Sequence, residues 1–316
     1  LSEPTVIAVN TTTNEVCAAG NSALEMLGRT PPHIQAVRPL HDGVISSFTL
    51  TNEMIKIFLK RVMSKIGGHP RIMMCVPSGV TDVEQRAVIE AAREVGAKDV
   101  YIIEEPVAAA LGAGFDISRP KGTLIVDIGG GTTDIAVLSM NGVAVSSSLK
   151  VAGNYFDNLI ARYVRRQHGL AIGQVTAESV KIQIGRVYAG ADEISMNVKG
   201  RDIKTGMPRV ITLLSSEIFE VLRRPARQIA DEVLSVLEQT SPELVSDISE
   251  VGITLTGGCS QIYGFDALLM ERTGINCTIA DDPDSCTAYG CGKSLAWINH
   301  MQEGPINIAR KRMMRG

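Results

Sequence analysis

Apolar residues follow two alternating patterns along this chain: short continuous runs, typical of strands, and residues spaced by three or four, typical of helices. In the first hundred residues these patterns predict strands over 5–9, 15–18, 71–76 and 100–103, and helices over 52–66 and 81–95. Thr81 and Glu84 form the capping-box pattern that opens a helix. The segment 28–43 is rich in proline and glycine and is predicted to be a loop.

The rest of the chain continues the alternation. Strands are predicted over 123–127, 135–138, 143–149, 252–256 and 277–280, and helices from about 155 and over 177–187, 216–239 and 262–272. Asn141-Gly142 predicts a two-residue hairpin turn. Pro225 is predicted to kink or divide the helix 216–239. Because strands alternate with helices and hairpins also occur, the fold class is α/β with mixed sheets.

Composition narrows the class of protein. Of the 316 residues, 45% are hydrophobic and 21% are charged, which supports a large core and excludes wholesale disorder. The 34 acidic and 31 basic residues give a net charge of −3, and a nucleic-acid binder would usually be strongly basic. The six cysteines form no CxxC pair, so reduced thiols in a cytosol are expected. No apolar run reaches the roughly 18 residues of a membrane-spanning helix.

A glycine-rich turn between two predicted strands carries the strongest chemical signal. Its sequence is Asp127-Ile-Gly-Gly-Gly-Thr132-Thr-Asp134. Glycines tolerate positive φ and expose backbone N–H groups, which together bind phosphate oxygens. Asp127, at the end of a strand, suits a hydrated cation beside that phosphate. A strand follows the turn, so this is not the dinucleotide-binding fingerprint, which must open a helix. An ordinary glycine-rich hairpin is the alternative.

Three further segments carry candidate chemistry. Glu104-Glu105-Pro106 ends a predicted strand, where a carboxylate orients or deprotonates a water, or merely suits the dipole of the next helix. Thr256-Gly257-Gly258-Cys259-Ser260 is either a turn that admits a flat ligand or a phosphate, or a simple tight turn. Glu178 and Lys181 share one helix face, where they either grip a polar ligand or form a surface ion pair.

In this order, the four segments resemble those of the actin, sugar kinase and heat-shock-chaperone ATPase superfamily. The resemblance is closest to the MreB/Mbl branch of bacterial actins and spans nearly the whole chain. The other resembling stretches are 21–30, 38–44, 103–114, 126–134, 141–142 and 241–249. The family's Asp-Leu-Gly-Thr loop, its first phosphate clamp, has no counterpart here. The N-terminal strand pair is therefore expected to be missing and ATP binding to be weakened.

The resemblance implies an actin-like, two-lobed ATPase fold with mixed sheets and a nucleotide cleft between the lobes. Domain I would hold residues 1–118 and 289–316, and domain II residues 119–288. The small subdomains would cover about 3–45 and 153–213. The implied ligands are ATP and Mg²⁺, with Asp127 holding the hydrated metal ion. Glu105, helped by Thr132, would orient the attacking water. The implied nucleotide-binding residues are Asp127, Gly129, Gly130, Gly131, Thr132, Gly153, Glu178, Lys181, Gly257, Gly258, Cys259 and Ser260.

The function implied by the resemblance is an ATP-dependent filament that maintains rod cell shape by organising cell-wall (peptidoglycan) synthesis. Hydrolysis would be coupled to polymerisation. The implied partners are further copies of the chain and membrane-associated cell-wall elongation proteins. The implied location is the cytoplasm, at the inner face of the cell membrane. The basic run Arg310-Lys-Arg312 would add weak attraction to an anionic membrane surface. A chaperone-type ATPase and a small-molecule kinase of the same superfamily are the alternatives.

Overall fold

The structure is a computed structural model that describes residues 1–41, 44–78, 80–190 and 192–297. The predicted basic run Arg310–Arg312 and the end of the predicted loop 28–43 therefore lie outside the described residues. Contacts divide the chain into two compact units, Leu1–Ile103 with the segment from Leu295 onward, and Glu104–Ser294. Within the described ranges, no helix is long and apolar enough to cross a bilayer.

The first unit begins with a small antiparallel sheet. Its strands are β1 (Ile7–Asn10), β2 (Val16–Ala19) and β3 (Ile34–Val37) in the order β2-β1-β3, and α1 (Asn21–Met26) follows β2. Strands β4 (Leu40–His41) and β5 (Val44–Ile45) pair next. The prediction of a loop over 28–43 is therefore wrong, because β3 and β4 lie within it. Ile34 and Ala36 pack against one small apolar core and Val37 against another, and so short an alternation is hard to recognise between prolines.

The remaining elements of the first unit match their predictions closely. They are α2 (Phe48–Ile66), β6 (Arg71–Val76), α3 (Asp82–Glu94) and β7 (Asp99–Glu104). The capping box of α3 is confirmed: the backbone N–H of Thr81 donates to the Glu84 carboxylate at 2.9 Å, and that of Glu84 donates to the Thr81 hydroxyl at 3.3 Å. Local hydrogen bonding thus fixes the start of this helix, as expected from sequence.

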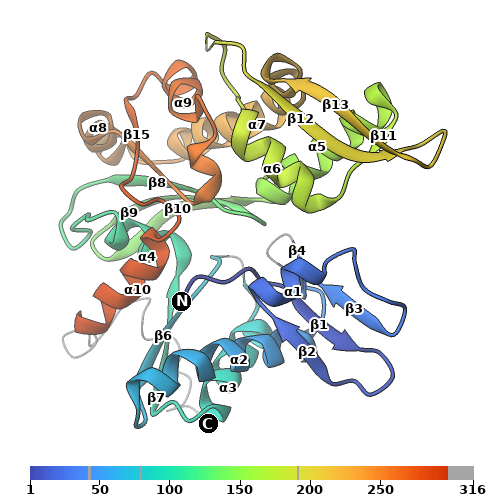
Figure 1. Cartoon of the computed structure of the whole chain (residues 1–316). Coiled ribbons are helices and arrows are strands. Elements are labelled where there is room, and N and C mark those ends of the chain that lie inside the picture. Colours follow the sequence, from blue (N-terminus) through green and yellow to red (C-terminus); the bar gives the residue numbers. More distant parts are fainter. Residues whose placement is uncertain (42–43, 79, 191, 298–316) are drawn as a thin grey trace. The chain divides into compact units, whose positions relative to one another are not determined.

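A five-stranded mixed sheet organises the second unit. Its strands are β8 (Thr123–Ile128), β9 (Thr133–Ser139), β10 (Gly142–Leu149), β14 (Ile253–Thr256) and β15 (Cys277–Ile279), in the order β10-β9-β8-β14-β15. β8, β9 and β10 are antiparallel neighbours, whereas β8, β14 and β15 are parallel. The predicted α/β class with mixed sheets is confirmed. Figure 1 shows this sheet between α7, α8 and α9 on one side and α4 and α10 on the other.

The β9–β10 turn is one residue out of the predicted register. Its central residues are Met140 and Asn141, with φ of 50° and 59°, and Gly142 already pairs with Ser139 across the hairpin. Asn141-Gly142 was expected at the centre because that dipeptide favours positive φ. The apolar register of the two strands places the turn one residue earlier.

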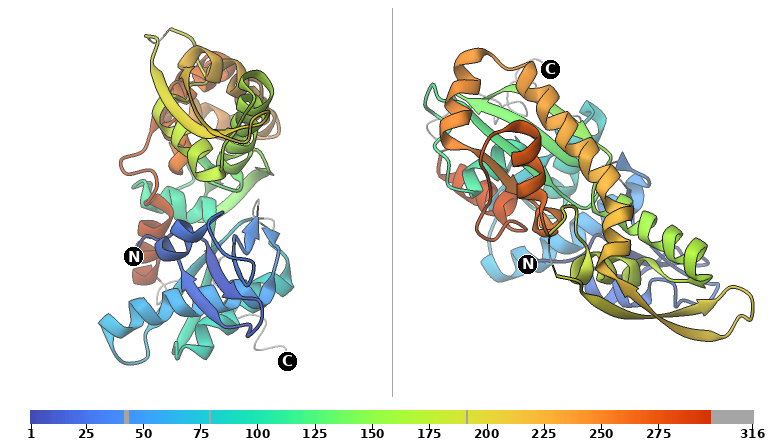
Figure 2. Two further views of the ribbon diagram at one scale, coloured as in Figure 1. Left: turned by 45° about the vertical axis from the view of Figure 1, so that its right-hand side comes forward. Right: turned by 90° about the horizontal axis from the view of Figure 1, so that it is seen from above.

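A second sheet and most of the helices complete this unit. The strands are β11 (Leu170–Ala171), β12 (Ser195–Asp202) and β13 (Pro208–Leu214); the helices are α4 (Glu105–Gly112), α5 (Gly153–His168), α6 (Gln174–Ile184), α7 (Ser215–Glu238), α8 (Pro242–Val251), α9 (Phe265–Thr273) and α10 (Cys286–Trp297), with the 3₁₀ turn η1 at Gly258–Gln261. Pro225 lies inside α7 without dividing it, and Figure 2 shows α7 as one long helix. Helix α8 was not predicted.

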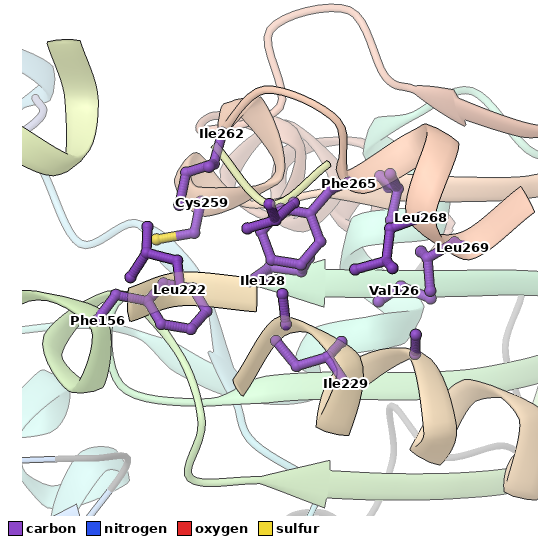
Figure 3. Close-up of a cluster of buried hydrophobic side chains, with 14 of the residues drawn as sticks. Val126, Ile128, Phe156, Leu222, Ile229, Cys259, Ile262, Phe265, Leu268 and Leu269 are labelled. Carbon is purple, nitrogen blue, oxygen red and sulfur yellow. The ribbon is translucent and has the colours of Figure 1, made fainter. Parts of the chain in front are cut away.

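The main core lies on one face of the five-stranded sheet. Leu124, Val126 and Ile128 of β8 pack there against residues of α5, α7 and α9. Figure 3 shows this cluster, with Phe156 and Phe265 facing each other at a ring-centroid distance of 6.2 Å. Because side chains alternate along a strand, Ile125 and Asp127 belong to the opposite face.

Helix α4 contacts β8 and β9, and its residues lie outside the main core, so it covers that opposite face. It also crosses α10 at a distance that only glycine permits. A Cβ at Gly112 would overlap the carbonyl oxygen of Cys286, and one at Gly290 would overlap that of Ala108. This close packing places residues 104–118 and 289–294 in the second unit by contact. The family-based boundaries near 118 and 289, and the subdomains over 3–45 and 153–213, stay predictions.

Candidate functional site

Two carboxylates lie side by side on the α4 face of the sheet. Asp127 of β8 pairs directly with Asp134 of β9 in the antiparallel register, so both side chains leave the same face. Asp127 is 9% exposed and Asp134 is 3% exposed. Burial raises the pKa of Asp127 to about 6, opposed by a 3.1 Å hydrogen bond from the Thr287 hydroxyl and increased by the charge of Asp134. Burial also raises the pKa of Asp134, against the hydrogen bonds from Thr132 and Ser148.

The glycine-rich turn joins these two strands, and its carbonyl groups are tied to the start of α5. The N–H of Gly153 donates to the carbonyl of Gly129 at 3.1 Å, and that of Asn154 donates to the carbonyl of Gly130 at 2.7 Å. In a trans peptide the C=O and the next N–H point in opposite directions, and no described peptide bond is cis. The N–H groups of Gly130 and Gly131 therefore point away from α5.

These two N–H groups and that of Thr132 have no backbone acceptor among the described residues. A Cβ at Gly130 would meet nothing within 4 Å, so the space in front of the turn is open. Two adjacent, outward N–H groups beside open space make a donor pair for an anionic oxygen.

The expectation that the glycines of this turn adopt positive φ is wrong for two of them. Gly129 and Gly130 do not adopt the positive φ that was predicted for the turn. Gly129 is instead constrained by the hairpin, because its N–H donates to the Thr132 carbonyl at 2.9 Å and a Cβ would lie 3.3 Å from that oxygen. At Gly130 the absence of a side chain leaves open space in front of the turn, and the backbone conformation itself does not require glycine.

The turn after β14 lies at the same edge of the sheet and is crowded. Gly257 has a φ of +80°, and a Cβ there would overlap the Asp127 carboxylate and lie 2.5 Å from the carbonyl oxygen of Ile128. Its N–H donates to the Pro283 carbonyl at 2.9 Å, so it is not free for a ligand. The Ser260 hydroxyl donates to the Gly257 carbonyl at 2.6 Å and is likewise used within the turn. Gly258 is exposed beside Asp284, whose carboxylate oxygen would lie 3.4 Å from a Cβ.

Helix α6 brings Lys181 to the same place from a third element. The Lys181 ammonium lies 2.9 Å from the Asp157 carboxylate and 3.3 Å from the Gly153 carbonyl oxygen, and its side chain is only 7% exposed. A Cβ at Gly153 would lie 2.7 Å from the Cys259 sulfur and 3.0 Å from the Lys181 nitrogen. The surface ion pair offered as the alternative for Lys181 is therefore wrong. Glu178 is half-buried on the same helix.

Cys259 joins this group from η1. Burial raises the pKa of its thiol to about 11, against the pull of the Lys181 charge, so the thiol is neutral near pH 7. Figure 3 shows its sulfur within the apolar cluster, near Leu222 and Ile262. Cys259 thus contributes packing and not reactivity.

Glu105 opens α4 at the end of β7, as predicted. It is half-buried, and Pro106 follows it in the first turn of the helix. Since α4 covers the face that carries Asp127 and Asp134, Glu105 starts a helix on the side of the sheet where both carboxylates lie. Its role in positioning water stays a prediction.

Several contributors were missed from sequence. Thr287 donates to Asp127 from 160 residues away, Pro283 accepts from Gly257, and Asp157 pairs with Lys181. Asp157 follows Gly153 by one helical turn, a spacing that would have placed it on the same face of α5 as the start of the helix. Thr287 and Pro283 carry no local signal, because only the β14–α10 connection brings them to the site.

A nucleotide fits this arrangement in two respects. The outward N–H pair of the turn faces open space, and a carboxylate at a strand end lies beside it. The described residues hold no group of three His, Cys, Asp or Glu side chains able to bind a metal ion by themselves. A Mg²⁺ ion would therefore need phosphate and water ligands besides Asp127, as this ion commonly does.

The fold is a mixed α/β sheet whose edge carries two buried carboxylates beside a glycine-rich turn with outward N–H groups. The profile of the MreB/Mbl protein family matches residues 1–303. The chain belongs to this family. It is 47% identical over 305 residues to the cell shape-determining protein MreB of Escherichia coli K12, covering 95% of this chain and 88% of the relative.

Solved structures agree with this assignment. MreB5 of Spiroplasma citri bound to ADP is 40% identical, with a TM-score of 0.87 over 95% of this chain and 89% of that protein. The same protein bound to AMPPNP has a TM-score of 0.86, covering 95% of this chain and 90% of that protein. The predicted actin-like fold and the resemblance to the MreB/Mbl family are thus confirmed.

Proposed function

We propose that this chain is an actin-like cytoskeletal protein that binds adenine nucleotides and assembles with copies of itself to determine cell shape. The observation that carries the proposal is the outward N–H pair at Gly130 and Gly131, fixed by the two hydrogen bonds from α5. A relative at 40% identity is bound to ADP in one crystal structure and to AMPPNP in another. The cell-shape role is supported by the name of the 47% identical relative.

Each residue of the site has a defined task in this proposal. The N–H groups of Gly130 and Gly131 donate to phosphate oxygens, with the Thr132 hydroxyl beside them. Asp127 would hold a hydrated Mg²⁺, which would supply positive charge against the phosphates. Glu178 and Lys181 of α6 and the turn Gly257-Gly258 line the adenosine side, and Cys259 and Ser260 support that turn from within, since the Ser260 hydroxyl donates to the Gly257 carbonyl. Gly153 allows α5 to approach the turn.

Glu105 orients the attacking water and accepts its proton, helped by the Thr132 hydroxyl. Its place at the start of α4, on the side of the sheet that carries Asp127 and Asp134, supports this role. The proposal includes three further features. Hydrolysis is coupled to polymerisation, the filament contacts membrane-associated cell-wall elongation proteins, and it lies in the cytoplasm at the inner face of the cell membrane.

Sedimentation with and without ATP and Mg²⁺ tests the function. The chain is expected to pellet at micromolar concentration in an ATP-dependent manner, which a chaperone-type ATPase or a small-molecule kinase would not do. Glu105→Ala is expected to keep nucleotide affinity but to slow phosphate release by about 10²–10⁴. Glu104→Ala, the adjacent residue, is the matched control and is expected to release phosphate at the unaltered rate. ATP-independent pelleting, or equal rates in the two variants, would contradict the proposal.

A further inference from the structure

We infer that Asp157 and Lys181 form a positioning pair that fixes the phosphate-binding turn through the first turn of α5. This inference rests on the proposed nucleotide binding and assigns Asp157 a role in it. Both side chains are buried behind the turn, with exposed fractions of 2% for Asp157 and 7% for Lys181. Removing two charges from water is costly, so an ion pair in this position requires an explanation beyond stability.

The contacts of Lys181 form a continuous path to the turn. Its ammonium bonds to the Asp157 carboxylate at 2.9 Å and donates to the Gly153 carbonyl at 3.3 Å, and both partners belong to the first turn and a half of α5. The N–H of that same Gly153 donates to the Gly129 carbonyl. A shift of the ammonium therefore moves Gly153 and, through a single hydrogen bond, the turn itself.

The path also decides the direction of the ligand-binding N–H groups. The peptide planes after Gly129 and Gly130 are set by the bonds that their carbonyls accept from Gly153 and Asn154. If the start of α5 is displaced, these planes rotate and the N–H groups no longer point into the open space. Ala152, the N-cap residue, gives α5 no side-chain cap, and the first N–H groups of the helix, those of Gly153 and Asn154, donate to the carbonyls of the turn instead.

The packing around the pair leaves little freedom. A Cβ at Gly153 would lie within 3.0 Å of both the Lys181 nitrogen and the Cys259 sulfur. The pair thus holds α5, α6 and η1 at one point. The Lys181 ammonium is directed at Asp157 and at the backbone of α5.

Three variants test the inference: Asp157→Asn, Lys181→Met and the double variant. The double variant removes both charges and so leaves no unpaired buried charge. Each is expected to lose ADP affinity by about ten- to a hundredfold, the worth of one charge-assisted hydrogen bond. The double variant is expected to be no weaker than either single variant, because the residues act as one unit. In Asp157→Asn, affinity for adenosine, which lacks phosphates, is expected to stay within about twofold of the unaltered protein, because Lys181 itself is kept.

Asp202→Asn is the matched control. Asp202 pairs with Arg209 at 2.7 Å with its side chain 11% exposed, but on β12, away from the turn. This variant is expected to lose stability and to keep its ADP affinity. If Asp157→Asn behaves like Asp202→Asn, the pair is merely structural and the inference is overturned. An equal loss of ADP and adenosine affinity in Asp157→Asn would also overturn it, because the turn donates to phosphate and not to adenosine.

Amide hydrogen exchange of the ligand-free protein separates this inference from the proposed function. Exchange at Gly153 and Asn154 is expected to accelerate at least tenfold in Asp157→Asn and to stay unchanged in Asp202→Asn. If the unaltered chain binds no ADP, the proposed nucleotide binding fails, and the exchange rates alone still show whether the pair orders the turn. Unchanged exchange in Asp157→Asn would refute the inference whatever the affinities are.

Discussion

The turn at 129–131 and the turn at 257–258 follow parallel neighbouring strands and lie at the same edge of one sheet, yet they need glycine for different reasons. Gly257 has positive φ and is packed against Asp127 and the backbone of Ile128. Gly130 has no positive φ and no neighbour within 4 Å of a Cβ. Glycine at 257 therefore permits folding, whereas glycine at 130 leaves space for a ligand.

The largest effect is expected at the crowded turn. Gly257→Ala would place a Cβ on the Asp127 carboxylate and against a carbonyl oxygen at an unfavourable φ, so the free energy of unfolding is expected to fall by about 3–5 kcal/mol. Denaturant unfolding measures this. Gly274→Ala is the control: its φ is +73° with nothing within 4 Å, so only the conformational cost of about 1 kcal/mol is expected. Equal losses would show that crowding at 257 is irrelevant.

The second-largest effect on the free energy of unfolding is expected from replacing Asp127, whose carboxylate lies beside Gly257. Its folded pKa of about 6 exceeds the ordinary value of 3.8, so the folded state binds the proton more tightly and the ionised carboxylate costs stability. That cost is absent below about pH 4, grows as the pH rises to 6 and is complete at pH 7. Asp127→Asn is therefore expected to stabilise the ligand-free protein by a few kcal/mol at pH 7 and by almost nothing at pH 4.

The same substitution is expected to weaken Mg²⁺-dependent nucleotide binding at pH 7, since the ionised carboxylate would be lost. Urea unfolding at several pH values, with a nucleotide titration at pH 7, measures both effects. Asp99→Asn, at an exposed aspartate of β7, is the control for the pH series. A stability difference between Asp127→Asn and the unaltered chain that stays constant from pH 4 to 7 would contradict the assigned pKa.

The open turn is expected to respond in the opposite way to the crowded one. Gly130→Ala adds a methyl group in empty space, so the free energy of unfolding is expected to change by less than about 0.5 kcal/mol. The methyl group occupies the space in front of the N–H pair, so ADP affinity is expected to fall at least about tenfold. Gly292→Ala, also without neighbours but on α10, is the control and is expected to keep its affinity. Unchanged binding in Gly130→Ala would place the ligand elsewhere.

The elements around these turns also show which features could be predicted from local sequence patterns. Strong local signals predicted their elements well: the capping box of Thr81 and Glu84, the β6 run and the strands around Asp127 all lie where expected. The short alternation of β3 was not recognised. Helix α8 was missed although it carries helix signals, namely Ser241 before Pro242 at its start and apolar residues at 244, 245, 248 and 251. The glycine-rich turn was found because such a turn between two strands is unusual, whereas the other nucleotide-binding residues were assigned through the family resemblance.

What sequence reasoning could not supply was the reason for each glycine and the distant partners. The N–H of Gly257 donates to the distant Pro283 carbonyl, whereas the carbonyl of Gly130 accepts from α5, so the conformation of each glycine is tied to a partner far along the chain. The partners Thr287 and Asp157 were missed because one depends on tertiary structure and the other resembles an ordinary helix residue. Local patterns therefore gave the fold class and the glycine-rich turn, whereas the orientation of the N–H groups and the pKa of Asp127 depend on tertiary contacts.

The smallest effect is expected at a third turn of the same sheet, which has neither crowding nor a ligand. Met140 has a φ of 50° and is 69% exposed, so its side chain adds strain and little packing. Met140→Asn replaces it with a residue that tolerates this conformation, and a gain of about 0.5 kcal/mol in the free energy of unfolding is expected. Met270→Asn is the control, because this exposed methionine lies on α9 and asparagine disfavours a helix. If Asn141 and Gly142 were the central residues, Met140→Asn would bring no gain. A gain in stability in Met140→Asn with a loss in Met270→Asn would therefore confirm the turn register. The gain would also give the free-energy cost of backbone strain alone, which can be compared with the larger cost of crowding in Gly257→Ala.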